Sequence, residues 1–234
     1  MSFFAAVRAA TLPSGGLFAC RSFANKQSGL RFLLCAGLLF FALGSGACAY
    51  MLDPGPPPVR MQLHPAMPQP SAAAPVNKQL VVALPTAGRE LENDRIALLF
   101  HGREVRFLAE ARWTGAVPYL LQRKFVEALE ASAVLAGVSD DVTGIVANAR
   151  LLSDISMFGL EYSAGGTAPV ARFSAHFRLL DLYSGKILAT RTIESRAPAS
   201  DESPAALVFA CEKALSEALG IMTAWTGEQM RKAR

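Results

Sequence analysis

The sequence predicts an α+β fold, in which two amphipathic helices pack on one face of an antiparallel or mixed sheet. Short apolar or alternating runs between residues 80 and 193 have the pattern of strands. Two longer segments repeat their apolar residues every three or four positions, as helices do. The order along the chain is strands, helix, strands, helix, and about 150 residues are enough for one hydrophobic core.

Both predicted helices begin at a proline. Pro118 suits a first helical turn, and the residues after it keep helical spacing for about four turns. Ser203 can cap the second helix, with Pro204 in its first turn. The second helix has an apolar stripe that includes Cys211, which we interpret as a small core residue rather than a reactive thiol.

Six segments are predicted as strands: Leu80–Leu84, Asp94–Phe100, Val105–Ala109, Asn148–Tyr162, Phe173–Leu179 and Ile187–Ile193. The clearest is Phe173–Leu179, where apolar and polar residues alternate strictly, whereas the alternation in Asn148–Tyr162 is untidy. Turn residues join the second segment to the third and the fifth to the sixth, so each of these pairs is predicted as a hairpin.

The positive charge of the chain belongs to its N-terminal segment. The chain has 23 basic and 19 acidic residues, a formal net charge of +4. Residues 1–47 contain four of the basic residues and no acid, which leaves residues 48–234 electrically neutral. The composition therefore gives no support for a nucleic-acid-binding domain, and we expect no nucleic-acid partner.

Residues 1–47 are interpreted as an export signal. Residues 32–43 form an uncharged apolar run with Arg31 before it and small residues after it, which is the layout of a secretory signal peptide. Cys48 follows Gly46 and Ala47, and this arrangement resembles the lipobox of bacterial lipoproteins, with Ser45 where leucine is usual. We therefore expect Cys48 to carry a diacylglycerol and an N-acyl chain, and we expect no other cofactor.

Three alternatives for this segment stay open. The uncharged run extends to Leu52 and is about long enough to cross a bilayer as an uncleaved anchor. Residues 1–31 also have the acid-free composition of an organellar transit peptide. A translation start further into the chain would account for the length of the leader.

Residues 48–79 are predicted as the lipidated N-terminus followed by a tether rich in proline and alanine. Eight of the 14 prolines lie in residues 54–79, and proline favours extended conformations and cannot donate to a strand ladder. An irregular edge of the domain is the alternative. The single domain is then predicted over residues 80–227, and residues 228–234 form a disordered basic tail.

No catalytic or metal-binding constellation is apparent. His64, His101 and His176 lack metal-ligand spacing, and the adjacent carboxylates Asp140 and Asp141 fit a solvated turn. The chain contains neither a phosphate-binding loop nor a nucleophile elbow. The sequence therefore predicts no catalytic residue, no metal site and no enzymatic activity, although a hydrolase with dispersed residues stays open.

Five short motifs, taken in order, resemble the ABC-type transport auxiliary lipoproteins. This family includes the lipoprotein of the paraquat-inducible lipid-transport operons, and the resemblance spans residues 48–227. The motifs are Cys48 with Tyr50-Met51-Leu52-Asp53, then Asp94-Arg95-Ile96-Ala97, Glu110-Ala111-Arg112-Trp113, the segment Leu121–Ala128, and Trp225-Thr226.

The resemblance implies a non-enzymatic accessory subunit of a system that moves lipids between membranes. The implied partners are a substrate-binding protein of the mammalian-cell-entry type, a permease and a cytoplasmic ATPase. Association of the chain with further copies of itself, as a homo-oligomer, stays open. Ala49, rather than Asp, follows the cysteine and favours the periplasmic face of the outer membrane over the inner membrane. The alternative function is a stand-alone periplasmic lipoprotein that binds a lipid or another ligand.

Three residues of these motifs are candidate contacts with a partner. Arg95, Arg112 and Trp113 are expected at the surface, because arginine and tryptophan are enriched at the centres of protein interfaces. The alternatives are that Arg95 ends a strand and that Trp113 fills the space before the first helix.

Overall fold

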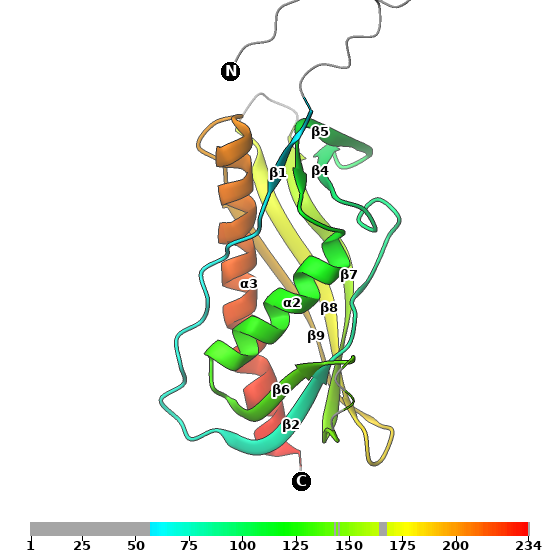
Figure 1. Cartoon of the computed structure of the whole chain (residues 1–234), viewed down its shortest axis with the longest axis vertical. Coiled ribbons are helices and arrows are strands. Elements are labelled where there is room, and N and C mark those ends of the chain that lie inside the picture. The colour runs from blue at the N-terminus through cyan, green and yellow to red at the C-terminus, as the bar shows by residue number, and fades with distance from the viewer. Residues whose placement is uncertain (1–56, 143, 145, 164–167, 234) are drawn as a thin grey trace, which may run out of the picture. The chain divides into compact units, whose positions relative to one another are not determined.

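The computed structural model describes residues 57–142, 144, 146–163 and 168–233, all within the compact unit Pro56–Arg234. In these residues one mixed sheet of nine strands lies against two helices (Figure 1), so the predicted α+β class is confirmed. The strands are β1 (Val59–Met61), β2 (Val76–Val82), β3 (Thr86–Ala87), β4 (Arg95–Phe100), β5 (Glu104–Trp113), β6 (Leu135–Asp140), β7 (Ala149–Tyr162), β8 (Val170–Asp181) and β9 (Ile187–Pro198), and the helices are α2 (Val117–Ala131) and α3 (Pro204–Lys232).

Strand β7 is the centre of the sheet. Along one edge it pairs antiparallel with β8, and β9 continues the sheet beyond β8. Along its other edge, β2, β3 and β4 pair with successive parts of β7, all of them parallel to it. One long strand therefore fixes the positions of three shorter ones.

The sheet divides into two arms on the second edge of β7. Strand β6 pairs with β2 in one arm, whereas β5 and then β1 extend the sheet from β4 in the other. Between the arms, Pro85, which has no N–H to donate, lies between β2 and β3, and a compact loop then joins β3 to β4. Asn93 closes this loop by donating from Nδ2 to the carbonyl oxygens of Arg89 (3.3 Å) and Glu90 (3.1 Å).

A bulge in β7 explains its untidy alternation. Leu151 and Ile155 face the core, the register with β8 shifts between Ile155 and Met157, and Phe158 and Leu160 then face the core. The extra residue moves the buried side chains from odd to even positions.

Both helices cover the same face of the sheet, as predicted. α2 has Pro118 in its first turn, and α3 has Ser203 as its N-cap, where Oγ accepts a hydrogen bond from the N–H of Ala206 (3.3 Å). The predicted apolar stripe of α3 is buried, including Cys211. Burial raises the pKa of the Cys211 thiol to about 12, so this side chain is an unreactive part of the core.

A chain of aromatic rings connects the strands to α2. The rings lie 5.4–6.4 Å apart between centroids, in stacked or edge-to-face pairs. In order from the β5 arm they are Trp113, Phe158, Phe173, Phe125 and Phe177.

The proline-rich stretch lies against the domain, so the prediction that it makes no strand ladder is wrong. Residues Val59–Met61 form β1 and pair with β5, and Leu63 is 1% exposed. Val59, Met61 and Leu63 alternate with polar residues, and prolines are absent between positions 59 and 64, so a short strand can form there.

The rest of this stretch follows α3. The N–H of His64 donates to Glu212 Oε1 (2.7 Å), and the N–H of Ala66 donates to Ser216 Oγ (2.8 Å). The N–H of Ser71 donates to the carbonyl oxygen of Ser132 after α2 (2.8 Å), so backbone donors at positions 64, 66 and 71 bind this segment to the domain surface.

The prediction of a disordered basic tail is also wrong, because α3 continues to Lys232 and buries Met230. Lys78 stabilises this end, since Nζ donates to the carbonyl oxygens of Met230 (3.3 Å) and Ala233 (2.5 Å). Strands β1, β3 and β6 were not predicted. β3 has only two residues, and β6 is mostly half-buried and lacks an alternating pattern.

Replacing Gly159 with alanine is expected to lower the free energy of unfolding by about 1–3 kcal/mol, because the new Cβ would collide with the backbone carbonyl of Ala97 in β4. Urea denaturation, followed by circular dichroism, measures the change.

The matched control is Gly220→Ala in α3, where an added Cβ meets no atom within 4 Å. Alanine at this helical position is expected to be neutral or to stabilise by up to about 1 kcal/mol. Equal effects of the two substitutions would contradict the close approach of β4 and β7.

Candidate functional site: an arginine row beside a buried tryptophan

Three arginines form a row across the β1–β5–β4 arm. Arg112 on β5 pairs in register with Arg60 on β1 and with Arg95 on β4. Residues in register on neighbouring strands project from the same face of a sheet. We call Arg60, Arg112 and Arg95 the arginine row. It lies on the side of the arm that faces away from the core, since Ala111 and Trp113 on either side of Arg112 are completely buried.

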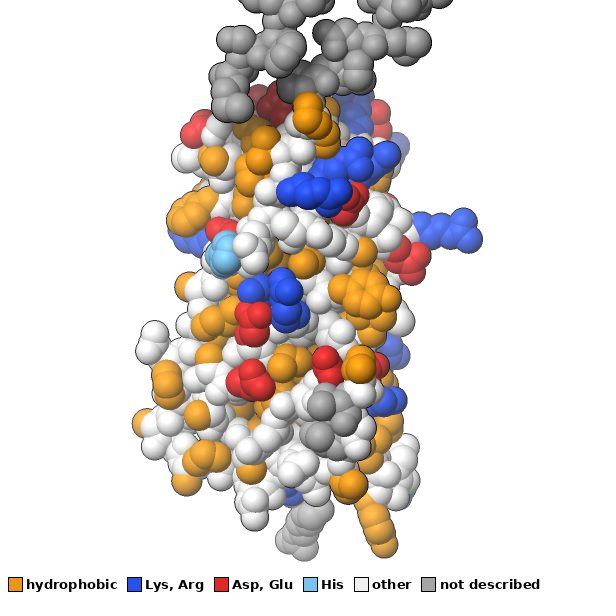
Figure 2. Space-filling view, in the orientation of Figure 1, with side chains coloured by type: hydrophobic (Ala, Val, Ile, Leu, Met, Phe, Trp, Pro, Cys, Tyr) orange, Lys and Arg blue, Asp and Glu red, His pale blue; other side chains and the backbone are white. Residues whose placement is uncertain are grey.

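Asp94 is the carboxylate that the structure places against this row. Its two carboxylate oxygens lie 3.5 Å from guanidinium nitrogens of Arg60 and Arg112 respectively. Its position is fixed by the backbone, since its carbonyl oxygen accepts from the N–H of Trp113 (2.7 Å). One carboxylate therefore pairs with two of the three guanidinium groups, and the row carries excess positive charge. The upper part of Figure 2 shows Lys or Arg side chains beside an acidic one.

Arg95 is held by an aromatic ring rather than by an acid. Its guanidinium carbon lies 5.1 Å from the centroid of the Phe107 ring, a cation–π geometry. The ring positions the side chain without neutralising its charge, so the guanidinium N–H groups stay available to an anionic group from outside.

The structure brings two of the three predicted contact residues together at the surface. Arg95 is exposed, and the side chain of Arg112 is 37% exposed. Trp113 is 0% exposed and stacks on Phe158 with 5.6 Å between ring centroids, so the expectation that it lies at the surface is wrong. Arg112 and Trp113 are consecutive residues of a strand and therefore point to opposite faces.

Sequence reasoning missed Arg60, because it lies in the stretch that was assigned to the tether. The signal was present in the alternation of Val59, Met61 and Leu63 around it. Cys48, the predicted lipidation site, lies outside the described residues.

The histidines do not form a site. His64 is exposed on the segment beside α3, and His101 lies in the turn between β4 and β5 with a φ of 51°. His176 on β8 has Nδ1 3.0 Å from Thr192 Oγ1 on the neighbouring strand. Within the described ranges, no group of three His, Cys, Asp or Glu side chains is arranged to hold a metal ion.

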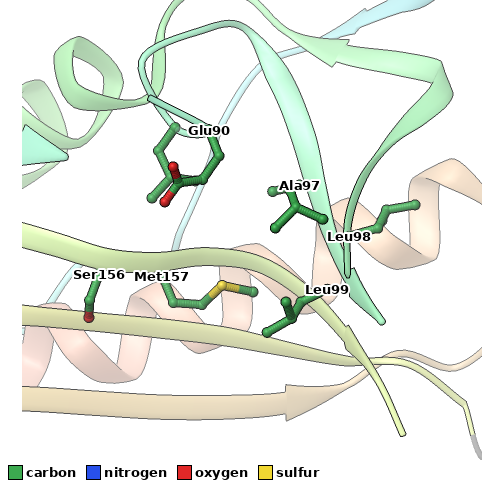
Figure 3. Close-up of a pocket in the computed structure, with 8 residues that line it drawn as sticks. Glu90, Ala97, Leu98, Leu99, Ser156 and Met157 are labelled. Carbon is green, nitrogen blue, oxygen red and sulfur yellow. The ribbon is translucent and has the colours of Figure 1, made fainter. Parts of the chain in front are cut away.

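A small apolar pocket lies beside the β4 end of the arm (Figure 3). Its volume is about 130 Å³, and most of its lining is aliphatic, with Glu90 and Ser156 as its polar members. Pockets that enclose drug-sized ligands have volumes of about 300–1,000 Å³. This one has room for a few methylene groups and not for a lipid.

No helix in the described part of the chain is both long and apolar enough to cross a membrane.

The family model of the ABC-type transport auxiliary lipoprotein component matches residues 62–220. The chain belongs to this family. The resemblance seen in the sequence motifs is thereby confirmed, and membership places the protein among lipoproteins that serve ABC-type transport and are attached to a membrane of the cell envelope.

Solved structures share the fold of this auxiliary lipoprotein. Protein XCC0632 from Xanthomonas campestris is 24% identical, with a TM-score of 0.68, and the match covers 74% of this chain and 98% of that one. An uncharacterized protein is 14% identical, with a TM-score of 0.56, and the match covers 75% of this chain and 99% of that one. These identities show a shared fold alone. No curated protein matches the chain.

The opposite placements of Arg112 and Trp113 predict very different stabilities for their alanine variants. Trp113→Ala is expected to lower the free energy of unfolding by about 3–5 kcal/mol, because it removes a buried ring and leaves a cavity. Arg112→Ala is expected to cost less than about 1 kcal/mol, because its ion pair with Asp94 is partly exposed. Urea midpoints measure both values. A cost for Arg112→Ala as large as that for Trp113→Ala would show that the row is part of the core and not a surface for binding.

Proposed function

We propose that this protein is a non-enzymatic accessory subunit of an ABC-type system that moves lipids between membranes. It is anchored in the outer membrane and faces the periplasm. There it docks or receives a carrier protein of the mammalian-cell-entry type, which works with a permease and an ATPase. The observation that carries the docking role is the arginine row, whose excess positive charge is displayed on a rigid three-stranded arm.

Charge complementarity makes acidic side chains the counterpart of this row on the carrier. Guanidinium groups bind carboxylates through paired N–H donors, and the spacing of neighbouring strands of about 4.8 Å sets three such donors side by side. Asp94 holds two of them in place before binding, so less side-chain entropy is lost when the carrier docks.

The proposed anchor is Cys48, with a diacylglycerol and an N-acyl chain. Residues 49–58 separate it from β1 and can span at most about 35 Å when fully extended. Because β1 is bound to the domain, the domain is held within that distance of the membrane rather than displaced further by the whole proline-rich stretch. Ala49 favours the outer membrane, and the inner membrane is the alternative location.

The small volume of the apolar pocket beside β4 favours docking over the alternative of a stand-alone lipid-binding protein. This pocket of about 130 Å³ is smaller than one acyl chain of a membrane lipid requires, and the larger cleft of about 460 Å³ beside Tyr183 is open to solvent. In this proposal the lipid is held by the carrier, and the auxiliary protein positions that carrier.

Mass spectrometry of the mature protein is expected to find Cys48 as the N-terminal residue with its acyl chains attached. Cys48→Ser is expected to move the protein from the membrane fraction to the soluble fraction, because two or three acyl chains are required for stable attachment. An unmodified Cys48 in a chain that still carries residues 32–47 would contradict this anchor.

The double variant Arg95→Ala/Arg112→Ala is expected to reduce co-purification of the carrier by at least about tenfold, since each side chain is placed to bind an acidic group directly. The matched control is Arg123→Ala on α2, an exposed arginine paired with Glu127 at 3.6 Å. Quantitative mass spectrometry of the affinity-purified complex measures the carrier. Equal recovery with the double variant and the control would remove the row from the proposed interface.

A further inference from the structure

Exposed hydrophobic side chains gather at the opposite end of the domain from β1. Six of the ten large hydrophobic side chains exposed in the described residues lie in two loops there. We call these six residues the distal tip. They are Val142 and Val146 in the β6–β7 loop, and Leu182, Tyr183, Ile187 and Leu188 in and beside the β8–β9 turn.

The two loops of the distal tip are joined. The N–H of Leu182 donates to the carbonyl oxygen of Asn148 (3.0 Å), and a cleft of about 460 Å³ lies between the loops. Val146, Leu182 and Tyr183 line this cleft. It is open to solvent and large enough to accept apolar side chains of another protein.

Tyr183 is presented on a fixed turn although its side chain is 101% exposed. Asp181 Oδ1 accepts hydrogen bonds from the N–H groups of Ser184 (2.6 Å) and Tyr183 (2.9 Å) and from Ser184 Oγ (3.0 Å). Gly185 supplies the positive φ of +68° that closes the hairpin. These donors, first the N–H of Ser184, lower the pKa of Asp181, so the turn keeps its carboxylate acceptor at neutral pH.

A fully exposed tyrosine on a fixed turn leaves apolar ring surface in water, and burying this ring in an interface loses little conformational entropy. Its ring offers a large contact area, and little backbone freedom remains to be lost on binding. The surrounding aliphatic side chains can exclude water from such a contact.

The register of the sheet places the distal tip away from the arm that contains β1. Ala149, the first residue of β7, pairs with Asp181 at the tip, whereas β4 and the β1 arm join β7 from Gly159 onward. Ten residue steps along a strand correspond to about 33 Å. Figure 1 shows β1 at one end of the domain and the β8–β9 hairpin at the other.

The charges at the tip argue for a protein rather than an anionic lipid surface. Residues 140–148 and 181–188, which form the two loops and their borders, contain three carboxylates, of Asp140, Asp141 and Asp181, and one ammonium group, of Lys186. Two further basic residues, Lys78 on β2 and Arg150 on β7, lie next to the loops, so basic groups are not in excess. Lys78 Nζ already donates hydrogen bonds to the carbonyl oxygens at the end of α3. Loops that bind anionic membranes carry an excess of basic residues, and this tip does not.

We infer that the distal tip is a second docking surface, which binds an apolar segment flanked by basic side chains on the protein partner of the transport system. This inference rests on the proposed function, because it assigns the tip to the same carrier. It is independent of the arginine row, because the two surfaces lie on different strands and at different levels of the sheet.

Site-specific photo-crosslinking in the full-length, membrane-attached protein tests the inference. A benzophenone amino acid replaces Tyr183 at the tip or, as the matched control, Tyr119 on α2, which is 64% exposed. The expected result is a crosslink from position 183 to the carrier, identified by mass spectrometry, at least tenfold stronger than that from position 119. Crosslinks from position 183 only to lipid, or only to a second copy of the chain, would overturn the inference.

Co-purification of the carrier separates the two proposals. The double variant Tyr183→Ser/Ile187→Ser is expected to recover at least tenfold less carrier than wild type, whereas Tyr119→Ser recovers the wild-type amount. Carrier recovery unchanged by the tip variant would overturn the tip and leave the proposed function intact. Failure of the wild-type protein to recover any carrier, together with the absence of a crosslink from the benzophenone at position 183 to the carrier, would overturn both.

Discussion

The contact between Trp113 and Phe158 holds β5, the central strand of the arginine row, against the rest of the domain. Strand β5 pairs with β4 and β1 alone, so the arm is joined to the rest of the sheet by the ladder between β4 and β7. The stacked rings add a direct contact between β5 and β7, and Phe173 and Phe125 continue it to β8 and α2. Because Arg112 is the residue before Trp113, the ring in the core also fixes the backbone from which the guanidinium group projects on the other side of the strand. The position of the candidate site therefore depends on an apolar contact that no partner touches, together with the β4–β7 ladder.

Strand β7 sets the distance between the two surfaces. Its first residues pair at the base of the distal tip, and its last residues pair with the strand that leads into the arginine row. A strand paired on both edges has little freedom to bend, so a partner that reaches both surfaces meets them at a constant separation. The bulge between Ile155 and Met157 lets the buried residues of both halves of β7 face one core despite the division of the sheet.

Local sequence patterns were sufficient to predict the two helices and the β8–β9 hairpin. Pro118, Ser203 with Pro204, and the alternation around Phe173 each specify their element without reference to distant residues. The parallel pairs of β7 with β2, β3 and β4 could not be predicted in this way, because parallel partners are chosen by long-range packing rather than by a turn. The same limit applies to the site. The sequence indicates Arg95 and Arg112, but only the register of β1 adds Arg60 to them, and only the packing of β5 against the core shows that Trp113 faces inward. Likewise, Val146 and Tyr183 are neighbours only after β7 and β8 have paired.

The two surfaces are suited to different parts of one association. Charges at a surface act over about one Debye length, which is near 8 Å at physiological ionic strength, and they raise the rate and set the orientation of encounter more than the final affinity. The arginine row is expected to act on the rate and orientation of encounter, since its groups remain largely hydrated. The distal tip is expected to act on the final affinity, because burying aliphatic and aromatic area contributes about 25 cal/mol per Å² with little dependence on salt. A carrier that is oriented by the row and held by the tip would bind with a rate that falls steeply as salt is added, and with a dissociation rate that changes little.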